Sequence, residues 1–270
     1  MDMAQVHARG LVLLGCGKMG SAMLQGWLAD GFPPDAVTVL DPFPSDWLKA
    51  QGVRLNAPLP AAPAIVLVAV KPQMMADALP VLKPFGGGET LFLSVAAGTP
   101  ISFYEDVLGA ETPIIRAMPN TPAAVGRGIT AIIGNTYATA DQLDLADHFL
   151  SAVGEVVRLG DESEMDAVTG LSGSGPAYVF HMVEAMARAG MAEGLPEALA
   201  MRLARATVTG AGELLYQSGE SATQLRINVT SPNGTTAAAL DVLMAETDGL
   251  PDLMVRAVKA AADRSRELAK

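Results

Sequence analysis

The sequence predicts an α/β Rossmann-type N-terminal domain, with a doubly wound and mostly parallel sheet, followed by an all-α C-terminal dimerisation domain. Three observations predict this fold class. Short apolar runs alternate with turns and helical stretches up to about residue 160, a G-x-G-x-x-G motif follows the first run, and only helical periodicity remains from about Glu162 onward. We therefore expect two domains, residues 1–161 and residues 162–270.

The N-terminal domain is predicted from apolar runs of strand length. Several of them are apolar on both faces, as strands buried between two layers of helices are. Helical stretches such as residues 21–30 separate the early runs, and this alternation predicts βαβ units. The predicted strands are residues 10–14, 36–40, 64–70, 90–95, 114–118, 129–133 and 156–159.

The G-x-G-x-x-G motif at residues 15–20 lies directly between the first strand and the first helix. In such a motif Gly15 makes a tight turn, Gly17 lets a pyrophosphate approach the backbone, and Gly20 lets helix and strand pack closely. The start of the helix adds N–H groups and the positive end of its dipole. The motif predicts a dinucleotide cofactor, NADP(H) or NAD(H). The residues expected to bind it here are Gly15, Gly17, Lys18, Met19 and Gly20.

Asp41 ends the second predicted strand, 21 residues beyond Gly20. An acid at this place accepts hydrogen bonds from the ribose hydroxyls of adenosine, which favours NAD(H). Residues 42–44 include no arginine for a 2′-phosphate, although Ser45 offers a hydroxyl. A helix-capping or merely solvated Asp41 is the alternative.

Composition excludes several other classes of protein. The formal net charge of −11 and the lack of a basic run argue against nucleic-acid binding. The longest apolar run, residues 64–70, is too short to span a bilayer, and the N-terminal residues lack a signal-peptide core. Cys16 is the single cysteine, which fits a reducing compartment and the role of a small loop residue. We expect a soluble, cytoplasmic protein with no metal site, since no His, Cys, Asp and Glu spacing suggests one.

The C-terminal domain begins with a glycine-rich segment, residues 170–180, in which Pro176 suits the first turn of a helix. Small and apolar residues cover more than one face of the predicted helices. We therefore expect a large homodimer interface. The predicted helices are residues 176–193, 196–217, 234–245 and 250–270.

Five segments together give the chain a resemblance, over almost its whole length, to the pyrroline-5-carboxylate reductases. These segments are residues 69–73, 94–98, 116–122, 170–180 and 228–236. The resemblance implies reduction of 1-pyrroline-5-carboxylate to L-proline with NAD(P)H, the last step of proline biosynthesis. It also implies intertwined dimers that can build larger rings.

The resemblance implies further site residues as well. Residues matching Val70, Lys71, Pro72, Ala96 and Ala97 lie against the cofactor in this family, and the residue matching Asn228 also reaches the cofactor. The loop beginning at Ser231 holds the substrate carboxylate.

Thr236 is the candidate catalytic residue. Gly234, Thr235 and Thr236 open a predicted helix, so their N–H groups suit a carboxylate, and the Thr236 hydroxyl would face the ring nitrogen. The substrate-binding set is thus Ser231, Gly234, Thr235 and Thr236. An ordinary N-cap threonine is the alternative for residue 236.

Two residues depart from the family pattern. Asn233 stands where a second glycine is usual, and Ile227 stands where an aspartate is common. Asparagine is the non-glycine residue best suited to a left-handed backbone, so we expect the loop to keep its shape. Substrate affinity is affected by these departures more than reaction type.

Other functions compete with the reductase interpretation. The β-hydroxyacid dehydrogenases share a similar glycine segment, but their catalytic lysine and asparagine fall on Val179 and Val183, and valine is no base. The remaining alternatives are an NAD(P)-binding regulatory protein without catalysis and a related imine reductase.

Overall fold

The computed structural model describes residues 3–268, and the chain forms two compact units. The first, called the sheet unit, takes in the chain up to Gly173 together with the final residues from Ala261. The second, called the helical unit, is Ser174–Ala260. Residues 162–173 belong to the sheet unit, in which Glu162 forms an ion pair of 2.7 Å with the buried Arg116. The predicted domain boundary between residues 161 and 162 stays a prediction.

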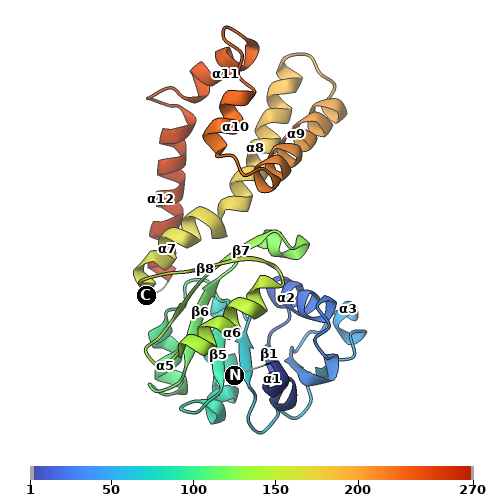
Figure 1. Cartoon of the computed structure of the whole chain (residues 1–270), viewed down its shortest axis with the longest axis vertical. Helices are drawn as coiled ribbons and strands as arrows, with labels where there is room; N and C mark the ends of the chain where they lie inside the picture. The colour runs from blue at the N-terminus through green and yellow to red at the C-terminus, as the bar shows by residue number, and fades with distance from the viewer. Residues whose placement is uncertain (1–2, 269–270) are drawn as a thin grey trace. The chain divides into compact units, whose positions relative to one another are not determined.

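The sheet unit contains, within residues 3–268, one eight-stranded sheet in the order β3-β2-β1-β4-β5-β6-β7-β8 (Figure 1). Neighbours from β3 to β6 are parallel, β7 is antiparallel to β6, and β8 is parallel to β7. The mostly parallel sheet predicted from the sequence is confirmed. The strands are β1 (Leu11–Leu14), β2 (Val37–Leu40), β3 (Arg54–Leu55), β4 (Ile65–Val68), β5 (Leu91–Ser94), β6 (Ile114–Met118), β7 (Gly128–Gly134) and β8 (Gly154–Arg158).

Helices cover both faces of this sheet. Because side chains alternate along a strand, Leu11 and Leu13 of β1 join one buried cluster with residues of α2 and α6. Val12 and Leu14 join a second cluster with residues of α4 and α5. The sheet is therefore doubly wound, as predicted. The helices of this unit include α1 (Met3–Arg9), α2 (Lys18–Ala29), α3 (Asp46–Lys49), α4 (Met75–Ala78), α5 (Ile101–Leu108), α6 (Ala140–Ser151) and α7 (Met165–Val168).

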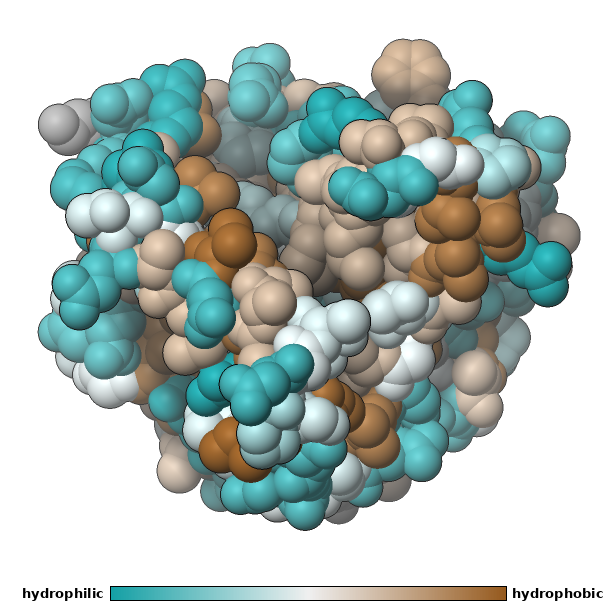
Figure 2. Space-filling model, turned by 90° about the horizontal axis from the view of Figure 1, so that it is seen from above, coloured by the Kyte–Doolittle hydropathy of each residue, from teal (hydrophilic) through white to brown (hydrophobic). Residues whose placement is uncertain are grey.

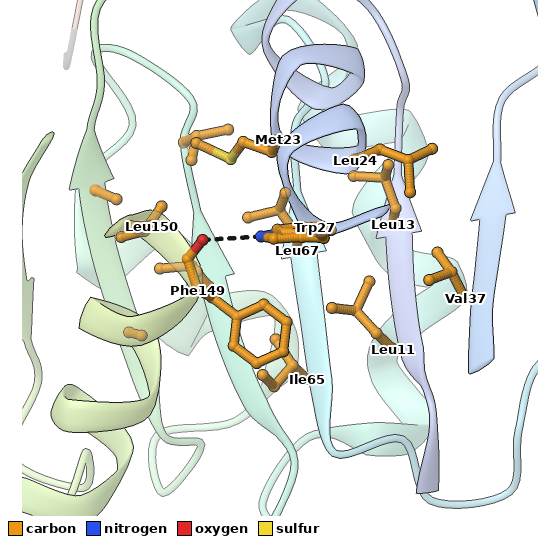
Figure 3. Close-up of a cluster of buried hydrophobic side chains, with 14 of the residues drawn as sticks. Leu11, Leu13, Met23, Leu24, Trp27, Val37, Ile65, Leu67, Phe149 and Leu150 are labelled. Carbon is orange, nitrogen blue, oxygen red and sulfur yellow. Dashed lines mark hydrogen bonds between the residues drawn. The ribbon is translucent and has the colours of Figure 1, made fainter. Parts of the chain in front are cut away.

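Trp27 and Phe149 join α2 to α6 above the sheet (Figure 3). Their rings meet edge to face with centroids 5.5 Å apart, and Trp27 Nε1 donates a hydrogen bond of 2.8 Å to the backbone oxygen of Phe149. This contact buries a large apolar ring and satisfies its one polar group at the same time. It holds α2, and so also the glycine loop that precedes α2.

Several elements differ in extent from the sequence-based expectations. Helix α2 starts at Lys18, earlier than the predicted residue 21, because Gly17 is its N-cap residue. Neither α1, whose Val6 is buried, nor β3, which has two residues, is predicted from the sequence. Strand β7 pairs antiparallel to β6, which no apolar run by itself predicts.

The helical unit has a very small core of its own. The helices that contribute to it are α8 (Gly175–Ala192), α9 (Glu197–Gln217), α10 (Ala222–Asn228), α11 (Thr235–Leu243) and the first part of α12 (Leu250–Leu268). Its cluster of buried apolar residues consists of Ala187, Ala200 and Ala204, with Val183 packed against them. Many larger apolar side chains are exposed instead, and Figure 2 shows such apolar patches on the face that includes these helices. None of the helices described in residues 3–268 is long and apolar enough to cross a membrane.

The glycine-rich segment begins in one π-helical turn, Thr169–Gly173, and continues into α8. The backbone oxygen of Ser172 accepts a hydrogen bond of 3.3 Å from the side-chain amide of Asn120. A Cβ on Gly173 would overlap the terminal methyl of Met118. The close approach at this glycine is therefore to a side chain of β6.

Candidate functional site

The glycine loop between β1 and α2 has three different glycine environments. Gly15 has a φ of +85°, and a Cβ there would lie 2.8 Å from Cγ1 of Val70. A Cβ on Gly20 would lie 2.5 Å from the backbone oxygen of Gly15, whereas one on Gly17 would meet nothing within 4 Å. The loop is thus tight at its two ends and open at Gly17, as a site for a pyrophosphate has to be.

The start of α2 presents backbone donors toward this open side. The first helical hydrogen bond runs from Ser21 N to the oxygen of Gly17 at 2.9 Å. The N–H groups of Lys18, Met19 and Gly20 lie ahead of that bond, so the helix does not use them. Together with the helix dipole they make a place for an anionic group.

A cavity of about 710 Å³ lies at the carboxyl ends of β1, β2 and β4. Strands β1 and β4 are neighbours although β2 and β3 lie between them in sequence, which marks the point where ligands bind in doubly wound sheets. Of the predicted cofactor residues, six line this cavity, namely Gly15, Gly17, Lys18, Asp41, Val70 and Lys71. The sequence did not indicate a further group of lining residues, which is Ser21, Gln25, Phe43, Trp47 and Met74.

The other predicted cofactor residues lie around it or elsewhere. Pro72 follows Lys71 and opens a short 3₁₀ helix, Pro72–Met74. Ala96 is buried and Ala97 exposed just beyond the end of β5. Asn228 belongs to the helical unit, where its side chain accepts a hydrogen bond of 2.7 Å from Gln224 and donates one of 2.9 Å to Glu220.

Asp41 is held by hydrogen bonds from the glycine loop and from its own turn. Its Oδ2 accepts from the backbone N–H of Cys16 at 2.8 Å, and its Oδ1 accepts from that of Phe43 at 2.8 Å. A carboxylate has about four acceptor positions, so both oxygens retain capacity for a ligand. The side chain of Asp41 therefore links β2 to the glycine loop and also lines the cavity.

Cys16 is a buried residue of the same loop. Burial, and secondly the negative charge of Asp41, raises the pKa of the Cys16 thiol to about 11. The thiol is protonated at neutral pH and is a poor nucleophile. This agrees with its interpretation as a small loop residue.

The predicted substrate loop precedes α11 in the helical unit. Gly234 N donates to the oxygen of Ser231 at 3.0 Å, which closes a four-residue turn. Pro232 occupies its second position and Asn233, with a φ of 53°, its third, the arrangement of a type II turn. Asn233 thus adopts the left-handed backbone that we expected of it.

The start of α11 has no side-chain cap. Gly234, and not Thr236, is the N-cap residue, so the N-cap alternative for Thr236 is wrong. The first helical bond runs from Ala238 N to the oxygen of Gly234 at 3.2 Å, which leaves the N–H groups of Thr235 and Thr236 ahead of it. Within residues 3–268 the structure records no hydrogen bond of the Thr236 hydroxyl.

Residues 3–268 contain no group of three or more His, Cys, Asp and Glu side chains that could hold a metal ion. The polar groups around both candidate sites are backbone N–H groups, hydroxyls, the ammonium groups of Lys18 and Lys71, the amide of Gln25 and the carboxylate of Asp41. These groups suit organic anions and sugar hydroxyls.

Two family models match the chain. Residues 162–268 match the model described as pyrroline-5-carboxylate reductase dimerisation, and residues 10–98 match the model described as NADP oxidoreductase coenzyme F420-dependent.

Known proteins are similar over nearly the full length. A pyrroline-5-carboxylate reductase of Synechocystis sp. is 42% identical over 96% of this chain and 98% of its own. The structure of a pyrroline-5-carboxylate reductase from Coxiella burnetii has a TM-score of 0.90, with 33% identity over 97% of this chain and 99% of its own. That of a Plasmodium falciparum pyrroline carboxylate reductase with NADP bound has a TM-score of 0.83, with 28% identity over 98% of this chain and 100% of its own.

Proposed function

Because this chain belongs to the pyrroline-5-carboxylate reductase family, we propose that its glycine loop and the start of its helix α11 hold the two reactants of that reaction. The protein is an oxidoreductase that reduces 1-pyrroline-5-carboxylate to L-proline with NAD(P)H, the last step of proline biosynthesis. The non-catalytic alternative considered from the sequence gives way to this activity. The roles of individual residues are our proposal.

The residues around the glycine loop fit a nicotinamide dinucleotide. The open backbone at Gly17 and the N–H groups at the start of α2 suit its pyrophosphate, and the free acceptor capacity of Asp41 suits its adenosine ribose. When bound in reduced form, this cofactor supplies the hydride that adds to the imine carbon. The cofactor set in our proposal is completed by Val70, Lys71, Pro72, Ala96, Ala97 and Asn228.

The start of α11 holds the substrate carboxylate in our proposal. The N–H groups of Thr235 and Thr236 are not used by the helix, and the positive end of the helix dipole favours an anion there. A Cβ on Gly234 would lie 3.1 Å from the backbone oxygen of Ser231, so glycine suits the end of this tight turn, and the hydroxyl of Ser231 lies at its beginning. A carboxylate fixed in this way orients the flat ring, which is the main demand of a hydride transfer.

Thr236 acts at the ring nitrogen. Hydride addition to the imine carbon moves the C=N electron pair to nitrogen, and the nitrogen of the product carries a proton. The Thr236 hydroxyl holds this nitrogen by a hydrogen bond or donates the proton to it. The observation that carries this role is the uncapped start of α11, where the hydroxyl is not used by the fold.

The family match also bears on the oligomeric state of the protein, and the composition bears on its location in the cell. The match of residues 162–268 to the dimerisation model supports a homodimer. We propose further that dimers can assemble into a larger ring, as the family resemblance implies. We also propose a cytoplasmic location, which the single cysteine supports.

Thr236→Val tests the catalytic role. We expect kcat to fall about 100-fold, as when a proton donor is lost, with the Kd for NAD(P)H unchanged. Thr236→Ser keeps the hydroxyl and should retain most of the activity. Steady-state oxidation of NADH and NADPH with 1-pyrroline-5-carboxylate measures both variants. Full activity of Thr236→Val would show that the hydroxyl has no part in the reaction.

A further inference from the structure

Asn56 lies beside the cofactor cavity, and its side-chain amide forms two hydrogen bonds with the backbone of Asp41. Its Oδ1 accepts from the N–H of Asp41 at 3.0 Å, and its Nδ2 donates to the oxygen of Asp41 at 2.9 Å. The opposite orientation of the amide would place donor against donor and acceptor against acceptor. The two bonds therefore fix the amide in one orientation.

The backbone of Asn56 is itself fixed in an unusual conformation. Its N–H donates to the oxygen of Val39 at 2.8 Å, which continues the pairing of β3 with β2. Its φ is 48°, in the left-handed region that asparagine tolerates better than most residues. This conformation directs the side chain of Asn56 back across the end of β2.

These contacts form a chain of hydrogen bonds that ends at the glycine loop. Asn56 holds the backbone of Asp41, and the carboxylate of Asp41 holds the N–H of Cys16. Both backbone polar groups of Asp41 and both of its carboxylate oxygens are thus engaged. The direction of the remaining acceptor positions of Asp41 is set by this arrangement.

We infer that Asn56 is a positioning residue that sets the relative affinity of the enzyme for NADH and NADPH, by fixing the Asp41 carboxylate toward the hydroxyls of the adenosine ribose. The inference rests on the proposed ribose-binding role of Asp41. A fixed carboxylate accepts hydrogen bonds from both hydroxyls of the adenosine ribose of NADH. It repels the 2′-phosphate that NADPH carries on the same ribose. A loosely held carboxylate turns away and loses both effects.

Asn56→Gly removes the amide without strain, because glycine adopts a positive φ readily. Calorimetric titration with NADH and with NADPH should show about three- to tenfold weaker binding of NADH, as expected for two lost hydrogen bonds. NADPH should be affected less, so that the ratio of the two Kd values moves toward NADPH. Asp248→Gly is the matched control, because Asp248 also has a positive φ, of 60°, and should leave this ratio unchanged.

The double variant separates positioning from general destabilisation. Asp41→Ala alone should weaken NADH more than NADPH, and adding Asn56→Gly should then change the ratio no further. An unchanged ratio in Asn56→Gly, an equal loss for both cofactors, or the same shift with and without Asp41 would overturn the inference. An unchanged ratio in Asp41→Ala would overturn it too. These titrations need no substrate, so a wild-type protein that fails to reduce 1-pyrroline-5-carboxylate refutes the proposed function independently.

Discussion

At the scale of single residues, Cys16 shows how burial and a neighbouring carboxylate keep a thiol of the cofactor loop neutral. The thiol is buried and lies close to the carboxylate of Asp41, and both features raise its pKa to about 11. A cysteine at the start of a helix would otherwise gain thiolate character from the dipole. Here desolvation and the neighbouring negative charge outweigh that effect, so the Cys16 thiol stays protonated and unreactive at neutral pH.

We therefore expect Cys16 to react slowly with iodoacetamide while the protein is folded. With a pKa near 11, against about 9 in the unfolded chain, its thiolate is roughly 100-fold scarcer at pH 8. Alkylation followed by mass spectrometry should show this difference, and the folded rate should rise steeply as the pH approaches 11. The free energy of unfolding should fall over the same range, because the unfolded thiol ionises first. Equal alkylation rates of folded and unfolded protein at pH 8 would contradict this account.

At the scale of elements, the turn that precedes α11 links backbone conformation to substrate binding. Its third position needs a positive φ, which Asn233 provides at 53°. A glycine fits this position as well, whereas a β-branched residue does not. The geometry of this turn determines where the first N–H groups of α11 point.

Asn233→Val should disrupt this turn and Asn233→Gly should preserve it. We expect a loss of more than about tenfold in kcat/KM for 1-pyrroline-5-carboxylate with valine, since a strained backbone of this kind costs roughly 1–3 kcal/mol. The glycine variant should stay within about threefold of wild type. Kinetics at saturating cofactor measure both, and the Kd for NAD(P)H serves as the control. A valine variant as active as the glycine variant would show that the turn does not position the substrate.

The elements also show what a sequence can and cannot predict. The parallel sheet, the glycine loop and the positive φ at Asn233 follow from apolar runs, glycine spacing and local conformational preference. Strand β3, with two residues, is too short to give a periodic signal. The hydrogen bonds between Asn56 and Asp41 join residues that are 15 positions apart and that the pairing of β2 with β3 brings together. Such contacts depend on tertiary structure, so no local sequence pattern predicts the hydrogen bonds between Asn56 and Asp41.

At the scale of the whole molecule, the helical unit explains why the protein is a homodimer. Leu199, Leu203 and Leu214 lie on one face of α9 by helical spacing and are 43%, 48% and 53% exposed in the single chain. The buried core of the unit is formed by alanines, which contribute little apolar area. We expect a second copy of the chain to cover this exposed apolar face of α9.

Charges on this face of α9 should separate the subunits. Light scattering should give wild-type protein a molar mass of at least twice the 27.9 kDa of one chain, and the Leu203→Glu/Leu214→Glu variant a lower mass. Val81→Glu is the matched control, because Val81 is 53% exposed but lies in the sheet unit. Its mass should equal that of wild type. An unchanged mass of the double variant would place the dimer contact on another face.

The distribution of aromatic residues has a spectroscopic consequence. The chain has two tryptophans, and both Trp27 and Trp47 belong to the sheet unit, one in its core and one in the wall of the cofactor cavity. Tryptophan emission therefore reports unfolding of the sheet unit and not of helices α8–α11. Far-ultraviolet circular dichroism is dominated by helices and reports both units. Recording the two signals during one denaturant titration would show whether the units melt together or in sequence.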